Sequence, residues 1–175
     1  MALIVEDGSL VTGAESYCSV AAADTYHSDS GNTAWAALVT ATKEQALRKA
    51  TRYMVGAYRH RWTGTRKTTT QALDWPRYMV PIRDTPTFQG TNLAYVPATI
   101  VPTEVVQACA EFALITATNG ALAPDLTSRV LREKVGDIEV EYDRGSPQFT
   151  VYRSLDMMLR PYLKAGGSSV VGLSR

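Results

Sequence analysis

The sequence is poor in the residue types that carry most catalytic and metal chemistry. Among 175 residues it has two cysteines, Cys18 and Cys109, and two histidines, His27 and His60. The cysteines are far apart, form no C-x-x-C pair and have no histidine at zinc-ligand spacing, which argues against a disulfide scaffold or a zinc site. We therefore expect two small apolar thiols in a reducing compartment, and neither a metal nor a cofactor.

Long apolar stretches are also missing. No run approaches the roughly 18 apolar residues of a membrane-spanning helix, and the opening MALIVEDG lacks the charged region and the apolar length of a signal peptide. A composition of 45% hydrophobic and 20% charged residues is that of a soluble globular chain, not of a disordered one. We expect a protein that is cytoplasmic, or assembled in the cytoplasm, and has no membrane contact.

Net charge is nearly absent too, at +1, but the charges are segregated along the chain. Residues 1–42 contain five acidic residues and no lysine or arginine, whereas residues 43–67 contain eight basic residues against Glu44 alone. This distribution indicates an electrostatic role for residues 43–67, either toward another molecule or toward acidic parts of the protein itself.

Two segments have the apolar spacing of long helices. The first is expected to begin at Thr42, where Thr42 to Gln45 has the form of a capping box, and to fade near Trp62. Its apolar face should consist of Leu47, Ala50, Met54 and Tyr58. The second, residues 103–118, has so narrow a polar stripe that we expect it at the centre of a helical bundle.

Shorter elements complete the predicted fold. We expect small helices at residues 19–30 and 33–39, and a last helix whose face carries Tyr152, Leu155 and Leu159 before Pro161 ends it. Residues 135–143 alternate between apolar and acidic side chains and predict a single half-buried strand, while residues 65–102 form a long, proline-punctuated loop. The expected fold is a mainly α small helical bundle with a short β element, α+β by strict count, over residues 1–165, followed by a Gly/Ser-rich tail at 166–175.

Three classes of function remain open at this stage. An enzyme is disfavoured because neither histidine has a nucleophile or acid in a recognised pattern, and GTRKT at residues 64–68 lacks the spacing of a phosphate-binding loop. Single-stranded nucleic acid is a possible partner, since residues 43–67 combine basic side chains with Tyr53, Tyr58 and Trp62. Assembly into a ring is the third, with acidic patches of one copy facing the basic segment of the next.

Several stretches resemble a known protein family. They are ALIVEDGSLVTGAESYCSVAAADTYH, TAWAAL with KEQALRKATRYM, YRHRWTG with QALDWPR, and REKVGDIEVEY followed by LRPYL. Together they are similar to the head–tail adaptor, or connector, proteins of tailed bacteriophages, some of whose relatives are labelled DnaT-like single-strand DNA-binding proteins. None of these stretches is a catalytic motif.

The resemblance implies a non-enzymatic structural role in the virion neck. Such proteins form a ring, commonly of about twelve copies, beneath the portal protein, dock the stopper or tail protein, and surround the double-stranded genome in the lumen. The C-terminal tail would then bind the portal through Gly167, Ser169, Val170, Val171, Leu173 and Arg175. Candidates for the subunit interface or the DNA channel are Arg48, Arg52, Arg59, Arg61, Trp62, Arg66, Trp75, Tyr95, Glu139 and Glu141. The alternative, a single-strand binding protein, would use Arg48, Lys49, Arg52, Arg59, Arg61, Trp62 and Arg66.

Overall fold

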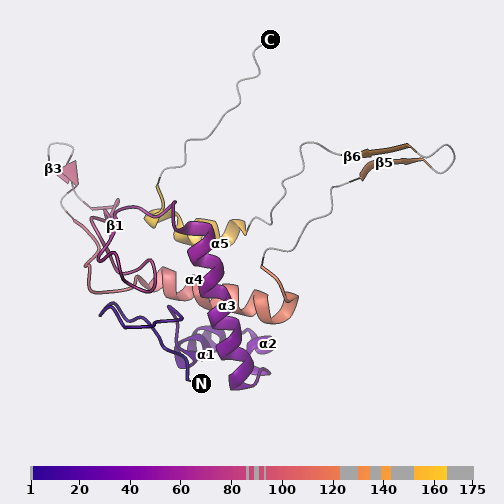
Figure 1. Ribbon diagram of the computed structural model, residues 1–175, viewed down its shortest axis with the longest axis horizontal. Coiled ribbons are helices and arrows are strands. Elements are labelled where there is room, and N and C mark those ends of the chain that lie inside the picture. Colours follow the sequence, from indigo (N-terminus) through magenta and orange to yellow (C-terminus); the bar gives the residue numbers. More distant parts are fainter. Residues whose placement is uncertain are drawn as a thin grey trace, which may run out of the picture.

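The computed structural model describes residues 2–85, 87–88, 91–92, 94–122, 130–134, 139–142 and 152–164. Two long helices, α3 (Thr40–Tyr58) and α4 (Thr103–Asn119), form the most extensive helix contact in this part of the chain. The short helices α1 (Val20–Asp29) and α2 (Thr33–Ala36) lie near the start of α3, and α5 (Arg153–Leu159) lies near its end (Figure 1). The prediction of a mainly α protein with a small β component is confirmed. The predicted tail, residues 166–175, lies outside the described residues.

The N-terminal arm packs on its own chain. Val5 pairs with Ser16 in a parallel bridge, and Glu6 is buried beneath the turn that follows. The Glu6 carboxylate accepts hydrogen bonds from three backbone N–H groups, those of Gly8, Leu10 and Val11. A buried carboxylate is tolerated when several donors satisfy it, so Glu6 fixes the path of the arm.

Helix α1 begins as its sequence predicts. The Ser19 hydroxyl accepts a hydrogen bond from the backbone N–H of Ala22, as a serine N-cap should. After a turn at Gly31, which has a positive φ of 72°, the short helix α2 places Trp35 in the core. Both predicted short helices are therefore present.

Helix α3 keeps the predicted apolar face but not the predicted cap. Leu47, Ala50, Met54 and Tyr58 are all buried. The helix begins at Thr40, two residues before the expected capping box, and no side chain caps it. The box is lost because the earlier start places Gln45 inside the helix, where its amide has an intrahelical partner and needs no Thr42 hydroxyl. The last helical residue is Tyr58, so Trp62 lies beyond the helix rather than at its end.

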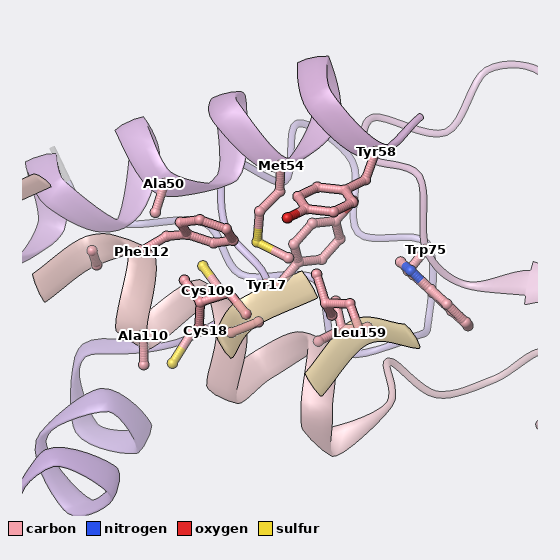
Figure 2. Packing of buried hydrophobic residues seen from close by; sticks show 14 of the residues in the cluster. Tyr17, Cys18, Ala50, Met54, Tyr58, Trp75, Cys109, Ala110, Phe112 and Leu159 are labelled. Atoms are coloured by element: carbon pink, nitrogen blue, oxygen red, sulfur yellow. The ribbon is translucent and has the colours of Figure 1, made fainter. Parts of the chain in front are cut away.

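Helix α4 occupies the central position that its sparse polar surface predicts. Pro102 precedes it, and Gly120, with a positive φ of 82°, ends it. Side chains from α3, α4, α5 and the long loop meet over it, with Met54, Phe112, Leu159 and Trp75 pointing into one cluster (Figure 2). Cys18 and Cys109 are buried in the same core as free thiols, and burial raises the pKa of both.

The long loop carries small β pairs and a buried hinge. Strand β1 (Thr65–Arg66) pairs antiparallel with β2 (Arg77–Tyr78), and β3 (Thr87–Phe88) with β4 (Thr91–Asn92). Between β1 and β2, all of Gln71–Arg77 except Ala72 is buried, and the Trp75–Pro76 peptide bond is cis. The Gln71 side chain donates to the carbonyls of Leu73 and Pro76, so these two carbonyls of the hinge have partners within it.

The prediction of a single strand at residues 135–143 is wrong in one respect. Strand β6 (Glu139–Tyr142) falls within that range, but it pairs antiparallel with β5 (Val130–Lys134) and is thus one half of a hairpin. The β5 sequence, VLREK, does not alternate as β6 does, so period-two patterning could not reveal it. At the end of the described chain, α5 continues into a 3-10 turn, η1 (Arg160–Tyr162), that contains Pro161 as expected. No helix among the described residues is long and apolar enough to cross a membrane.

The central packing leads to a stability prediction. Phe112 is fully buried, and its ring contacts those of Tyr53, Tyr58 and Tyr152 at centroid distances of 5.0, 6.2 and 5.5 Å. We expect Phe112→Ala to lower the free energy of unfolding by about 3–5 kcal/mol, because it leaves a cavity where three rings meet. Urea denaturation followed by circular dichroism measures the loss. Val39→Ala, at a residue 67% exposed, is the control, and a loss below about 1 kcal/mol for Phe112→Ala would contradict the central position of α4.

Candidate nucleic-acid interface

Five basic side chains converge on one groove beside α5. The groove encloses about 490 Å³, and besides one acidic residue, Asp156, its lining is basic or apolar. The basic residues that line it are Arg61, Arg83, Arg153, Arg160 and Lys164. All five are exposed, so their charges face solvent. We call this set of five residues and Asp156 the basic groove.

The spacing of residues along α5 builds one wall of the groove. Arg153, Asp156, Met157 and Arg160 follow one another at i, i+3, i+4 and i+7, which places them on one face of the helix and its 3-10 extension. The opposite face carries Leu155 and Leu159, which are buried in the core. Because the core holds these two leucines, the charged face is turned outward.

The second wall comes from the segment that follows α3. Trp62 and Leu163 form an antiparallel bridge. On either side of it, the N–H of Thr63 donates to the carbonyl of Tyr162, and the N–H of Lys164 donates to the carbonyl of Arg61 at 2.7 Å. Side chains that neighbour each other across such a bridge lie close together. The pairing therefore brings Arg61 and Lys164, which are 103 positions apart in sequence, to the same groove.

The long loop supplies the remaining cation. The Arg83 guanidinium donates to the carbonyl of Leu163 through Nη2 at 2.7 Å, and this bond ties the loop to the chain beyond η1. The loop turns back toward the body at Gly64, whose φ is +65° and whose missing side chain would collide with the backbone of Tyr78. Only glycine fits comfortably at this position.

Asp156 organises the floor of the groove. Its Oδ1 accepts a hydrogen bond from the Tyr58 hydroxyl at 2.8 Å and from Arg61 Nη1 at 3.2 Å. The Arg61 guanidinium also lies over the Tyr58 ring, 5.0 Å from its centroid. Burial first, and then the hydrogen bond to Asp156, raise the pKa of Tyr58 above its usual value, so this hydroxyl stays a donor. One carboxylate cannot neutralise five cations, and the groove keeps a strong positive potential suited to a phosphate chain.

A search among known proteins matches the whole chain, residues 1–175, to the family described as "Putative DnaT-like ssDNA binding protein". The chain belongs to this DnaT-like family. No curated protein and no solved structure matches. This match confirms the part of the sequence resemblance that concerns the DnaT-like family. A bacteriophage head–tail role stays a prediction.

In this DnaT-like protein, half of the eight basic residues of the 43–67 segment, Lys43, Arg48, Arg59 and Arg61, have acidic partners in the same chain. Lys43 contacts Asp24, Arg48 contacts Glu15 and Glu44, and Arg59 contacts the buried Asp74, at 2.8–3.4 Å. The hydrogen bond and the charge of Arg48 help hold the pKa of Glu15 below its usual range. The acidic N-terminal segment and the basic segment therefore meet within one subunit, without a neighbouring copy.

Of the three aromatic side chains proposed to stack on nucleic acid, Tyr58 and Trp62 are in the core and Tyr53 is partly buried against it; Trp75, a predicted interface residue, is in the core too. Trp62 and Trp75 are 1% and 0% exposed, and Tyr58 is 3% exposed. Neither tryptophan is available to a nucleic-acid base or to another subunit, so both must be removed from the set of interface residues. Their large apolar surfaces are worth more in the core than on a solvated helix side.

The other predicted residues are dispersed. Arg52 is exposed on α3 and Arg66 on β1, away from the basic groove, and Tyr95 is 42% exposed in the long loop. Glu139 and Glu141 lie on β6, opposite Lys134 and Arg132 of β5. The tail residues Gly167, Ser169, Val170, Val171, Leu173 and Arg175 lie outside the described residues. Of the predicted set, Arg61 alone lines the basic groove.

Four of the five groove cations escaped the sequence analysis. Arg83, Arg153, Arg160 and Lys164 lie outside the basic segment, in stretches whose local charge is unremarkable. The helical spacing of Arg153 and Arg160 on the face opposite Leu155 and Leu159 was the available signal. In the described part of the chain, no three histidine, cysteine or acidic side chains gather as a metal site would require.

Proposed function

We propose that the protein binds single-stranded DNA through the basic groove. The observation that carries this proposal is the convergence of five exposed cations around a single carboxylate. Phosphate neutralisation with release of counterions supplies most of the affinity of such surfaces. The family description, which names single-stranded DNA, supports the same assignment.

The basic residues of the groove have different roles in binding DNA. The arginines of α5 and η1, Arg153 and Arg160, contact successive phosphates, since guanidinium groups match phosphate oxygens in a bidentate manner. Lys164 adds a point charge at one end. Arg61 is oriented by Asp156 and by the Tyr58 ring, so its side chain is held in place before DNA arrives, which lowers the entropic cost of binding.

Charge reversal in the groove tests the proposal. We expect the double variant Arg153→Glu/Arg160→Glu to weaken binding of a fluorescent oligo-dT by at least about 100-fold in fluorescence anisotropy, because two phosphate contacts become repulsive. Lys49→Glu is the matched control, since Lys49 is an exposed base on α3 outside the groove. Wild-type affinity should fall about 100-fold between about 50 and 200 mM salt if about five phosphates are contacted. An equal loss in Lys49→Glu, or salt-insensitive binding, would contradict the proposal.

Removal of the carboxylate of Asp156 tests the same proposal, because it should raise the affinity for DNA where charge reversal lowers it. Asp156→Asn keeps an oxygen that can accept the hydrogen bond from Tyr58 and deletes the negative charge. We expect roughly fivefold tighter binding of the same oligonucleotide at low salt, the effect of about 1 kcal/mol at 4 Å in water. Unchanged or weaker binding, in a variant whose thermal unfolding matches that of the wild type, would count against a phosphate path along this groove.

We also propose, as a second candidate, the head–tail adaptor ring in the virion. Several large apolar side chains are exposed. In the long loop these are Met79, Tyr95 and Ile100, which are 63, 42 and 42% exposed, and on α5 it is Met157, which is 70% exposed. Exposed apolar groups of this size are typical of surfaces that another protein covers. Such a ring would have portal and tail proteins as partners and the double-stranded genome in its lumen.

The adaptor function makes a separate prediction. Deletion of residues 166–175 should leave a folded subunit that no longer joins portal-bearing heads, because the tail is the expected portal contact. Electron microscopy of the protein mixed with portal measures ring attachment, and the full-length chain is the control. Normal head completion by the truncated protein would show that the tail assignment is wrong.

A further inference from the structure

A second, larger cavity adjoins the basic groove. It encloses about 680 Å³, a size typical of small-ligand sites, and lies between η1, the start of α4 and the long loop. Arg83, Met157 and Arg160 line both hollows, so the two are continuous. A chain held along the groove by its phosphates therefore passes the mouth of this cavity.

The walls of the cavity are apolar and held in place. They include Pro81, Ile82, Val96, Pro97, Ile100 and Pro161. Two backbone hydrogen bonds join the wall segments. The N–H of Val96 donates to the carbonyl of Val80 at 2.9 Å, and the N–H of Ile82 donates to the carbonyl of Ala94 at 3.0 Å. Flat rings pack well against such a surface, whose proline rings and short aliphatic side chains need no rearrangement.

Four charged side chains line the cavity, the carboxylates Asp84 and Glu104 and the guanidinium groups of Arg83 and Arg160. Glu104, in the first turn of α4, lines the cavity, and its Oε2 accepts a 2.6 Å hydrogen bond from the hydroxyl of Tyr162. Burial first, and then this bond, raise the pKa of Tyr162, so the hydroxyl remains a donor and fixes the orientation of the carboxylate. Glu104 thus presents acceptor oxygens, with one already engaged, to whatever enters.

An oriented carboxylate discriminates among nucleobases. The Watson–Crick edge of guanine offers two adjacent donors, N1–H and N2–H, which match the two oxygens of a carboxylate. The corresponding edges of adenine, cytosine and thymine each place an acceptor beside the donor, and that acceptor is repelled by the negative charge. Among the four bases, guanine is the best partner for Glu104.

We propose that this cavity receives one unpaired base of the bound strand and that Glu104 selects guanine there. The inference rests on the proposed single-strand binding, because the phosphates in the groove deliver the base. Unstacked bases read on their Watson–Crick edge and packed on apolar surfaces are a general mode of single-strand recognition. The same cavity could instead be covered by a second copy of this chain, which the test distinguishes.

The test compares labelled oligo-dT strands of about 12 nucleotides with strands carrying one central dG, dA or dC, by fluorescence anisotropy. We expect about tenfold tighter binding of the dG strand, as one good bidentate contact provides, and no preference among the others. Glu104→Gln should abolish the preference and leave oligo-dT affinity within about twofold, because its amide N–H₂ opposes the donors of guanine. Tyr162→Phe, which keeps the carboxylate but removes the hydrogen bond that orients it, should reduce the preference without abolishing it.

A second variant tests the cavity independently, in case Glu104→Gln does not fold. Ile100→Trp, at a residue 42% exposed, fills the cavity from its rim and should also abolish the guanine preference. Equal affinity of the wild type for all four strands would overturn the cavity inference and leave the groove intact. Absence of binding to every strand would overturn both, and free dGMP that binds as tightly as the dG strand would overturn delivery by the phosphate chain. Self-association that Ile100→Trp abolishes, seen by light scattering, would assign the cavity to a second copy instead.

Discussion

A row of three aromatic rings holds together the parts of the chain on which the groove is built. Trp75 of the long loop contacts Trp62 and Tyr162 edge to face, with centroids 5.7 Å apart in each pair. These rings come from the segment after α3, the loop and η1, which are distant in sequence, and a backbone bridge between Trp62 and Leu163 joins the first to the last. With the rings buried, Arg61, Arg160 and Lys164 emerge beside one another at the surface, so the apolar contact underneath determines the electrostatics above.

Local charge counts are a poor guide to this arrangement. Half of the basic residues in the stretch after α2 are paired with acidic residues of the same subunit, such as Lys43 with Asp24 and Arg59 with Asp74. The basic groove is assembled from cations of three separate segments: the residues after α3, the long loop, and α5 with η1 and Lys164. Such partly exposed ion pairs contribute little stability each, but they decide which cations remain available to a partner.

How far the sequence could predict the structure depends on the range of the interaction. Leu47, Ala50 and Met54 repeat at helical spacing, so the buried face of α3 was predictable, and the narrow polar stripe of α4 predicted its central place. The Thr42 cap and the single strand failed because a helix start and a hairpin partner depend on contacts outside the local pattern. The burial of Trp62 and the joining of Arg61 to Lys164 depend on the bridge between Trp62 and Leu163, 101 positions apart in sequence, which no period along the chain encodes.

The two cysteines have a practical consequence. Cys18, which precedes α1, and Cys109, within α4, are buried in the core, and burial keeps both thiols protonated at neutral pH, whereas only a thiolate attacks alkylating and disulfide reagents. A reagent can reach either sulfur only after the helices separate. The rate at which the two native cysteines are modified therefore measures how often the core opens. This measurement needs no engineered label.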